Sequence, residues 1–484
     1  MVLLFKLWFL VICIGVIAYL AWKKPAILPA LLAGAVAFDI STTWLPPIAP
    51  MGSPDSLSLA RLFTVGVIGA ALWRLWKEPE LRRHLKVILK HFLSKGLLIY
   101  IAVGAFSFIY SIGRAKTVVE VLRLLVFFFL YLAIGLLVER RHVLLPFKVV
   151  HWVGVALVPL TIYEGATRHF IWRGYLAEGM IARVNATFVD PNIFARYLVL
   201  AVVANLILQY LNTDPKKRYI YFGALLGLLA ALAVTLSRSG VVTLIAVLVL
   251  LCLLIPRKRM VQPIAVLGLI GAVIVASRPT VWHRLLTFRK GLGALDAQRA
   301  YLWRVSWAMF RDHPLFGVGL GGFQKSFLTH YISYKTAIPY VKGVTLSHTT
   351  ILTIAAELGL VGLAALALVW VAVIWTLREL RGSKFEMTGT GNPLPVNEPE
   401  KVNAAEVEND KTSQGSSRGK KNISTGYLVG VGYFLWVVAV FISSQSEARF
   451  FEDPMIWIGM GMMIHLVIGE MGSDDKREFN SAAD

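Results

Sequence analysis

The sequence predicts an all-α polytopic membrane protein with about 12–13 transmembrane helices and one long extracytoplasmic loop. Of its 484 residues, 57% are hydrophobic and only 16% are charged, whereas a soluble domain is about 45–50% apolar and about 25% charged. The apolar residues come in long blocks close to the ~20 residues that a helix needs to cross a bilayer. A soluble enzyme is therefore excluded, because the chain lacks the charge to coat its surface.

Thirteen blocks have the apolar character of membrane spans, of which the second is the weakest. They are residues 3–22, 26–44, 57–76, 96–112, 118–138, 143–163, 193–211, 219–235, 241–255, 261–276, 349–377, 427–444 and 454–471. The first block is long enough to span and is followed by Lys23 and Lys24, so we expect it to remain as a helix.

The basic loops predict the orientation. The net charge is +21, and the short loops at 23–24, 77–95, 140–141, 216–218 and 257–259 carry many of the Lys and Arg residues. Because cytoplasmic loops retain positive charge, we assign these loops to the cytoplasm and expect no nucleic-acid partner. Met1 then lies outside, or inside if block 26–44 does not cross.

These assignments divide the chain into eight parts. They are N-terminal spans (1–163), an outer loop (164–192), central spans (193–276), a large extracytoplasmic loop (277–348), a span (349–377), a disordered cytoplasmic linker (378–426), C-terminal spans (427–471) and a cytoplasmic tail (472–484). The linker is rich in Gly, Ser, Asn, Glu and Lys, which is typical of disorder. The two cysteines, Cys13 and Cys252, both lie in apolar blocks and predict no disulfide or metal cluster.

The large outer loop is basic, although positive charge is usually concentrated in cytoplasmic loops. Residues 277–346 contain ten Lys and Arg residues and two acids, Asp296 and Asp312. A cationic face outside the membrane suits an anionic ligand such as a lipid diphosphate or headgroup. Within this loop, residues 299–311 predict an amphipathic helix that lies on the bilayer or caps the bundle, and His313-Pro314 ends it. Residues 317–322 (GVGLGG) predict a tight turn that a lipid or glycan approaches closely.

Arg238 is the first candidate site residue. It lies at the outer end of block 219–235, and the next block begins almost at once at residue 241. An arginine so close to hydrocarbon needs a partner or must extend to the interface. It either contacts lipid phosphate or binds a substrate phosphate, because the planar guanidinium group can donate two hydrogen bonds to a phosphate.

Two further arginines, Arg183 and Arg196, lie near the start of block 193–211. Asp190-Pro191-Asn192 is typical of a helix start, with Asp190 or Asn192 as the cap. Arg196 lies one turn inside the span.

His348 closes the long outer loop. A histidine at the membrane surface can act as a general base or proton relay near neutral pH, or serve only as an interfacial polar residue. The outer carboxylates are scattered, and the sequence has no P-loop, zinc spacing or nucleophile elbow. We therefore expect no metal and no cofactor, so that arginines would have to stabilise any phosphate leaving group.

Three segments in this order resemble the O-antigen ligase and O-antigen polymerase superfamily of bacterial membrane glycosyltransferases. They are residues 235–240 (TLSRSG), residues 299–303 (RAYLW) continuing to 312–319 (DHPLFGVG), and His348 with residues 356–362 (AELGLVG). The resemblance covers residues 183–362. Thr349 stands where the family often has an asparagine after the histidine.

The resemblance implies an enzyme of the cytoplasmic membrane with its active site facing outside. Such proteins move a glycan from an undecaprenyl-diphosphate carrier to an acceptor hydroxyl on a lipid, glycan or protein, with inversion and without metal. By position, Arg238 and Arg299 would neutralise the diphosphate and His348 would activate the acceptor. Arg183 and Arg311 would contact the substrate.

Two other functions remain open. A polysaccharide polymerase of the same superfamily shares the donor and differs in the acceptor. A transporter or flippase for an anionic lipid or solute predicts ionisable residues at mid-span, and Lys148, Arg196 and Glu357 are the main ones.

Overall fold

The computed structural model describes most of the chain as helix. The described residues are 1–46, 57–172, 175–177, 181–212, 214–255, 297–331, 347–382, 424–448 and 450–481, with short pieces between 264 and 272. Their one sheet is a short antiparallel hairpin of β1 (Tyr175–Ala177) and β2 (Ile181–Arg183), which the sequence did not predict. The predicted all-α fold class is confirmed.

Nine helical stretches of the described residues are long and apolar enough to span a membrane. They contain α1 (Val2–Lys23), α3 (Leu59–Lys77), α5 (Phe92–Phe106), α6 (Arg114–Leu137), α7 (Leu145–Thr167), α8 (Pro191–Leu211), α9 (Pro215–Val234), α16 (Thr350–Glu379) and α17 (Thr425–Ser444). Three further apolar helices are shorter than a full span: α2 (Leu28–Ala35), α10 (Arg238–Leu254) and the apolar part of α18 (Pro454–Ser481). The predicted span 261–276 lies mostly outside the described residues.

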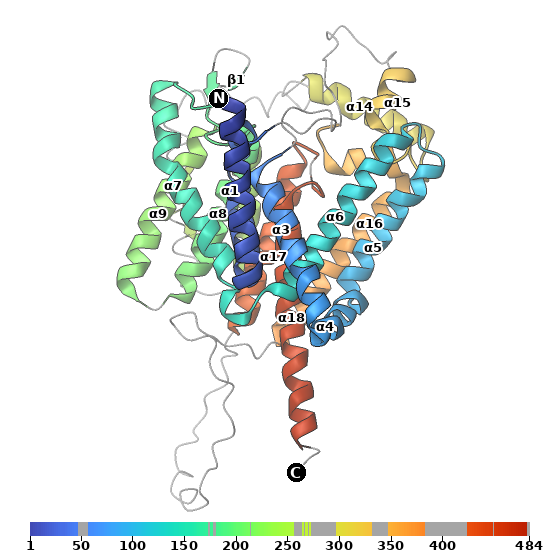
Figure 1. The fold of residues 1–484 in the computed structure, drawn as a ribbon. Coiled ribbons are helices and arrows are strands. Elements are labelled where there is room, and N and C mark those ends of the chain that lie inside the picture. The colour runs from blue at the N-terminus through green and yellow to red at the C-terminus, as the bar shows by residue number, and fades with distance from the viewer. Residues whose placement is uncertain are drawn as a thin grey trace, which may run out of the picture.

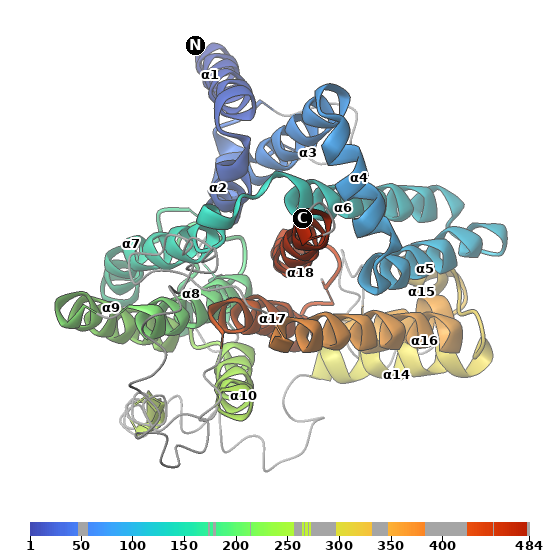
Figure 2. The same cartoon turned by 90° about the horizontal axis from the view of Figure 1, so that it is seen from below.

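The burial pattern of these helices is that of a protein surrounded by lipid. In α1 only Ile17 is buried, and most of the other apolar side chains of this helix are exposed. Figure 2 shows α1 at the rim of the bundle and α18 near its centre. By contrast, α8 and α17 are 83% buried over their most apolar window. A continuous apolar exterior of this length needs hydrocarbon rather than water around it.

The N-terminus lies at the same end of the bundle as the hairpin, α14 (Ala297–Asp312) and α15 (Phe323–Thr329), and the C-terminus lies at the other end (Figure 1). The weak block 26–44 consists of η1 (Pro25–Ile27), α2 and η2 (Asp39–Thr43), and it returns the chain to the end where α1 began. There the amide of Ile40 donates to the carbonyl of Thr187. This arrangement corresponds to the prediction that counts block 26–44 as crossing.

Two predicted boundaries differ from the structure. The basic segment after α3 is not a simple loop but contains the helix α4 (Pro79–Lys90), which buries Leu81 and Ile88 at a spacing of two turns. Helix α18 continues to Ser481, well beyond residue 471 where the predicted span ends. The predicted disordered linker lies outside the described residues, except for the end of α16 with η7 (Leu380–Gly382) and the cap and first residues of α17.

Helix α16 is broken at Gly359, and the glycine turn docks into the break. Gly359 has φ 61° and ψ −153°, a conformation that is essentially restricted to glycine. The amides of Val318 and Gly319 donate to the carbonyls of Ala356 and Glu357, and the amide of Leu360 donates to the carbonyl of Pro314. These bonds satisfy backbone groups that the break leaves without helical partners.

The turn at 317–322 is tight as predicted, and two of its glycines pack closely against other parts of the protein. Gly317 and Gly319 have positive φ. A side chain at Gly317 would collide with the backbone of Glu357, and one at Gly319 with Ser111. At Gly317 and Gly319 the close neighbour is therefore the protein itself, while the approach of a lipid or glycan to the rest of this turn stays a prediction.

Replacing Gly359 with alanine should destabilise the protein by about 2 kcal/mol or more. The new Cβ would lie 2.5 Å from the carbonyl carbon of Leu315 and would also strain the backbone. The midpoint of denaturant unfolding in detergent measures this loss. Gly69→Ala is the matched control, since the added Cβ has no neighbour within 4 Å. Equal midpoints for the two variants would show that the break at Gly359 does not need glycine.

Candidate active site

Arg183 ties the hairpin to the starts of α8 and α10. Its Nε donates to the carbonyl oxygen of Thr235 at 3.3 Å, and its Nη2 donates to Oδ1 of Asn192 at 2.8 Å. The hydroxyl of Ser237 donates to the same Oδ1 at 2.8 Å, and it accepts from the amide of Gly240, which caps α10. One amide oxygen thus joins the predicted Arg183 to the turn that carries Arg238.

The cap of α8 follows the sequence prediction. The carboxylate of Asp190 accepts from the amide of Asn192 at 2.7 Å, with Pro191 at the first helical position. Asp190 is therefore the cap. Asn192 instead turns its side chain to Arg183 and Ser237 and is nearly buried.

Arg238 is the first residue of α10 and is half-buried. The turn before it is constrained: Leu236 has φ 53°, a region that a branched side chain rarely adopts. Thr235 supports this turn with its hydroxyl, which donates to the carbonyl of Leu232 and accepts from the amide of Ser237. A guanidinium at a helix N-terminus adds to the partial positive charge there, so the arrangement suits an anion.

Arg299 and His348 belong to elements that contact each other. Arg299 lies one turn before Trp303 on α14, and the indole Nε1 of Trp303 donates to Oγ1 of Thr349 at 2.8 Å. His348 precedes Thr349 and has φ 59°. Its other neighbour, Ser347, accepts from the amide of Thr349 at 3.2 Å. The strained backbone at His348 is thus fixed on both sides, which is common at functional sites.

The end of α17 lies beside the start of α16. Oγ1 of Thr349 donates to the carbonyl of Gln445 at 3.2 Å, and Oε1 of Gln445 accepts from the amide of Ile351 at 3.3 Å. The hydroxyl of Thr350 lies 2.9 Å from that of Ser444. Since α17 also packs against α10, it connects the Arg238 side of the site to the His348 side.

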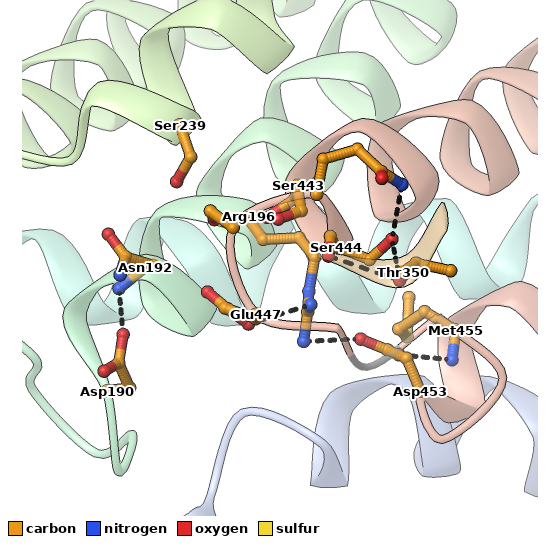
Figure 3. A network of polar contacts seen from close by, with 12 residues as sticks. Asp190, Asn192, Arg196, Ser239, Thr350, Ser443, Ser444, Glu447, Asp453 and Met455 are labelled. Carbon is orange, nitrogen blue, oxygen red and sulfur yellow. Dashed lines mark hydrogen bonds and ion pairs between the residues drawn. The ribbon is translucent and has the colours of Figure 1, made fainter. Parts of the chain in front are cut away.

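Arg196 lies at the centre of this connection (Figure 3). Its guanidinium is 3.2 Å from Glu447 and 2.7 Å from Asp453, and all three side chains are at least nine-tenths buried. In Figure 3, Asn192 and Ser239 lie on one side of Arg196 and Thr350 on the other. The sequence marked Arg196 as costly but did not identify its partners, which are about 250 residues away along the chain.

Helix α14 caps the bundle. Leu302, Val305 and Met309 are buried, and α14 packs against α16. Trp307 is 59% exposed, so only part of the predicted apolar surface faces the bundle. Burial also raises the pKa of the Tyr301 hydroxyl on the same helix, so that it remains protonated near neutral pH.

Arg311 is the predicted site residue that lies apart from the others. Its side chain is 70% exposed and forms an ion pair with that of its neighbour Asp312, at 3.8 Å. It lies twelve positions after Arg299 on the same helix, which corresponds to roughly 18 Å along α14.

Asn192→Ala should loosen the turn that carries Arg238. The change removes the acceptor for both Arg183 and Ser237, and leaving buried donors unsatisfied costs about 1–3 kcal/mol. Denaturant unfolding in detergent measures this cost. Asn212→Ala, at the end of α8, is the control because Oδ1 of Asn212 accepts a local bond from the amide of Asp214. A loss no larger than that of the control would contradict the role of Asn192.

The fold and the site define a class: a polytopic membrane protein with arginines and a histidine gathered at one end of its bundle. No group of three or more His, Cys, Asp or Glu side chains that could hold a metal occurs among the described residues. Residues 223–367 match the family model Wzy_C, described as O-antigen ligase. This match confirms the predicted resemblance to the O-antigen ligase and polymerase superfamily. No match to a curated protein was found.

The matched segment runs from α9 into α16 and contains Arg238, Arg299, Arg311 and His348. It supports a glycosyltransferase-like enzyme of the O-antigen ligase or polymerase type that works on lipid-linked glycans in a membrane. Arg183 and Arg196 precede it.

Proposed function

We propose that the protein is an O-antigen ligase-like glycosyltransferase of the cytoplasmic membrane, with its active site facing outside. It transfers a glycan from an undecaprenyl-diphosphate carrier to an acceptor hydroxyl on a lipid, glycan or protein. The observations that carry this proposal are the packing of α10, which begins with Arg238, against α17, and the hydrogen bonds that join the Arg299–His348 elements to the end of α17.

The reaction needs charge stabilisation more than covalent help from the protein. The acceptor oxygen forms a bond to the anomeric carbon while the bond from that carbon to the diphosphate oxygen breaks. The electron pair leaves with the lipid diphosphate, and the configuration at the anomeric carbon inverts. Arg238 and Arg299 offset the growing charge through charge-assisted hydrogen bonds, without a metal. His348 accepts the proton of the acceptor hydroxyl.

Arg183 and Arg311 have supporting roles in this proposal. Arg183 positions the turn of Arg238 through Thr235 and Asn192. Arg311, exposed near the end of α14, contacts parts of the substrate that lie farther from the reacting bond.

A polymerase would use the same donor and the same charges, and only the acceptor separates the two activities. A transporter or flippase is less well supported by the buried charges. Arg196 is paired with two carboxylates, and Glu357 accepts a hydrogen bond from the amide of Phe323 at 3.1 Å. Because these charged side chains have fixed partners within the protein, they favour a structural role over a role in conducting an ion or solute.

Proteoliposomes that contain a fluorescent lipid-linked glycan distinguish the enzyme from the transporter. We expect the label to pass to acceptors extracted from the source membranes, with the new linkage inverted as judged by NMR. Movement of the labelled lipid between leaflets, without a new covalent product, would support the flippase and overturn the proposal. A product made only when a second lipid-linked glycan is the acceptor would identify a polymerase.

A further inference from the structure

A cavity of about 260 Å³ lies between α5, α6 and α16, next to the glycine turn and the α17–α18 connection. The lining includes Thr350 and Thr353 of α16 and Gln324 of α15. Arg183, Arg238, Arg299, Arg311 and His348 do not line it. It is therefore a separate feature, although Thr350 follows His348 by only two residues.

Charged side chains of both signs line this cavity in fixed pairs. Glu120 accepts from Lys116 at 2.9 Å and from Arg123 at 2.7 Å, and Arg123 also lies 3.0 Å from Glu452. A third carboxylate, that of Glu357, is 4% exposed. The two cations are thus matched by the carboxylates of Glu120 and Glu452, so the cavity offers no excess of positive charge to a diphosphate or another multivalent anion.

The lining instead has the chemistry that recognises a sugar. Paired carboxylates and guanidinium groups present acceptors and donors side by side, which matches neighbouring sugar hydroxyls that can both donate and accept. Thr350 and Thr353 add hydroxyls, and Tyr100 and Phe451, with ring centroids 4.3 Å apart, add an aromatic wall. Known ligand cavities start at about 300 Å³, so this one suits a single sugar residue rather than a long glycan.

A wider basin of about 610 Å³ adjoins the cavity, and the two share Lys116, Gly321 and Gln324. The basin also includes Arg114 and Lys325. A ligand larger than one sugar can therefore extend from the cavity along the α6 and α15 ends. This space matters for an acceptor that is part of a larger molecule.

We propose that this cavity, here called the acceptor cavity, binds the sugar residue that carries the acceptor hydroxyl. The proposal rests on the proposed transferase function and adds the place and the recognition chemistry of its second substrate. Arg123, Glu120 and Glu452 are its specificity-determining residues, because their ion pairs fix the donor and acceptor positions before a ligand binds. The cavity lies close in sequence to the proposed general base, because Thr350 in its lining follows His348 by two residues at the start of α16.

The test is a binding measurement that does not depend on glycan transfer. In a Cys13→Ser, Cys252→Ser background, Gln324→Cys provides a thiol in the lining of the cavity, and its rate of maleimide labelling is followed in detergent. Glucose, galactose and N-acetylglucosamine at millimolar concentrations are the sugar probes, and sodium pyrophosphate is the anion probe. Thr329→Cys, on the same helix but absent from the lining, is the matched control.

At least one sugar should slow labelling of the Gln324→Cys thiol in a saturable way and leave the Thr329→Cys thiol unaffected. Adding Arg123→Gln or Glu452→Gln should raise the half-protecting concentration about tenfold, since each removes a hydrogen bond to a charged group. An unchanged labelling rate of the Thr329→Cys thiol in these variants shows that α15 keeps its fold.

Three results would overturn the proposal that the acceptor cavity binds a sugar. They are no protection by any of the sugars, protection by pyrophosphate alone, and sugar protection that Arg123→Gln and Glu452→Gln both leave unchanged. The labelling experiment contains no glycan donor, so its result does not depend on glycan transfer. A failure of the wild-type protein to transfer a glycan would therefore count against the proposed function but not against sugar binding in the cavity.

Discussion

Replacing Arg238, Arg299 or His348 with alanine should each lower the rate of glycan transfer by a factor of about 10² to 10³. Each arginine supplies charge that the leaving diphosphate needs most as its bond breaks, and His348 takes the proton of the acceptor hydroxyl. The rate of product formation with purified variants in proteoliposomes measures the effect. Arg238→Lys and Arg299→Lys should retain part of the rate, because they keep the charge but lose the planar fork.

Arg304→Ala is the matched control for these variants. Arg304 is an exposed arginine on α14, like the candidate Arg311, and its loss should leave the rate within about twofold, as expected for a surface charge. Arg311→Ala should fall between the control and Arg299→Ala. Variants of Arg238, Arg299 and His348 that fold and still transfer at the wild-type rate would remove these residues from the site.

The largest effect on stability should come from Arg196→Met. The change leaves Glu447 and Asp453 buried without their shared cation, and breaking a buried ion pair from one side costs about 3–5 kcal/mol. The free energy of unfolding by denaturant in detergent measures this loss. Transfer should fall as well, because the same cluster holds the end of α17, where Gln445 contacts Thr349 and Ile351.

The triple variant Arg196→Met, Glu447→Gln, Asp453→Asn separates the charge from the packing. Since it leaves no unpaired buried charge, it should recover most of the lost stability. A single Arg196→Met variant that loses less than about 1 kcal/mol would contradict the central role of this cluster.

Much of the fold followed from the sequence because the membrane imposes simple rules. Apolar length predicts where a helix can span, and the predicted blocks correspond to helices wherever the structure describes them. Local chemistry was readable too: Asp190 caps α8 as its position before Pro191 suggests. Block 26–44 remained ambiguous because it forms short helical pieces rather than one apolar helix.

The sequence predicted individual residues of the candidate site but not the contacts between them. The sequence identified Arg183 and Arg238 but not Asn192 as the acceptor that joins them, because Asn192 resembled a simple helix cap. The partners of Arg196 and the ion pair between Arg123 and Glu452 are contacts between distant segments, which no local pattern encodes. The break at Gly359 was missed because an apolar block with one glycine is typical of an ordinary span.

The most direct test of the central claim is glycan transfer by the wild-type protein in proteoliposomes with EDTA present. The donor is an undecaprenyl-diphosphate glycan, and the acceptors are extracted from the source membranes. We expect transfer at the same rate with and without EDTA, and its loss in His348→Ala protein that remains folded. Transfer that stops on addition of EDTA, or that proceeds equally with His348→Ala, would contradict a transferase that relies on its own arginines and histidine.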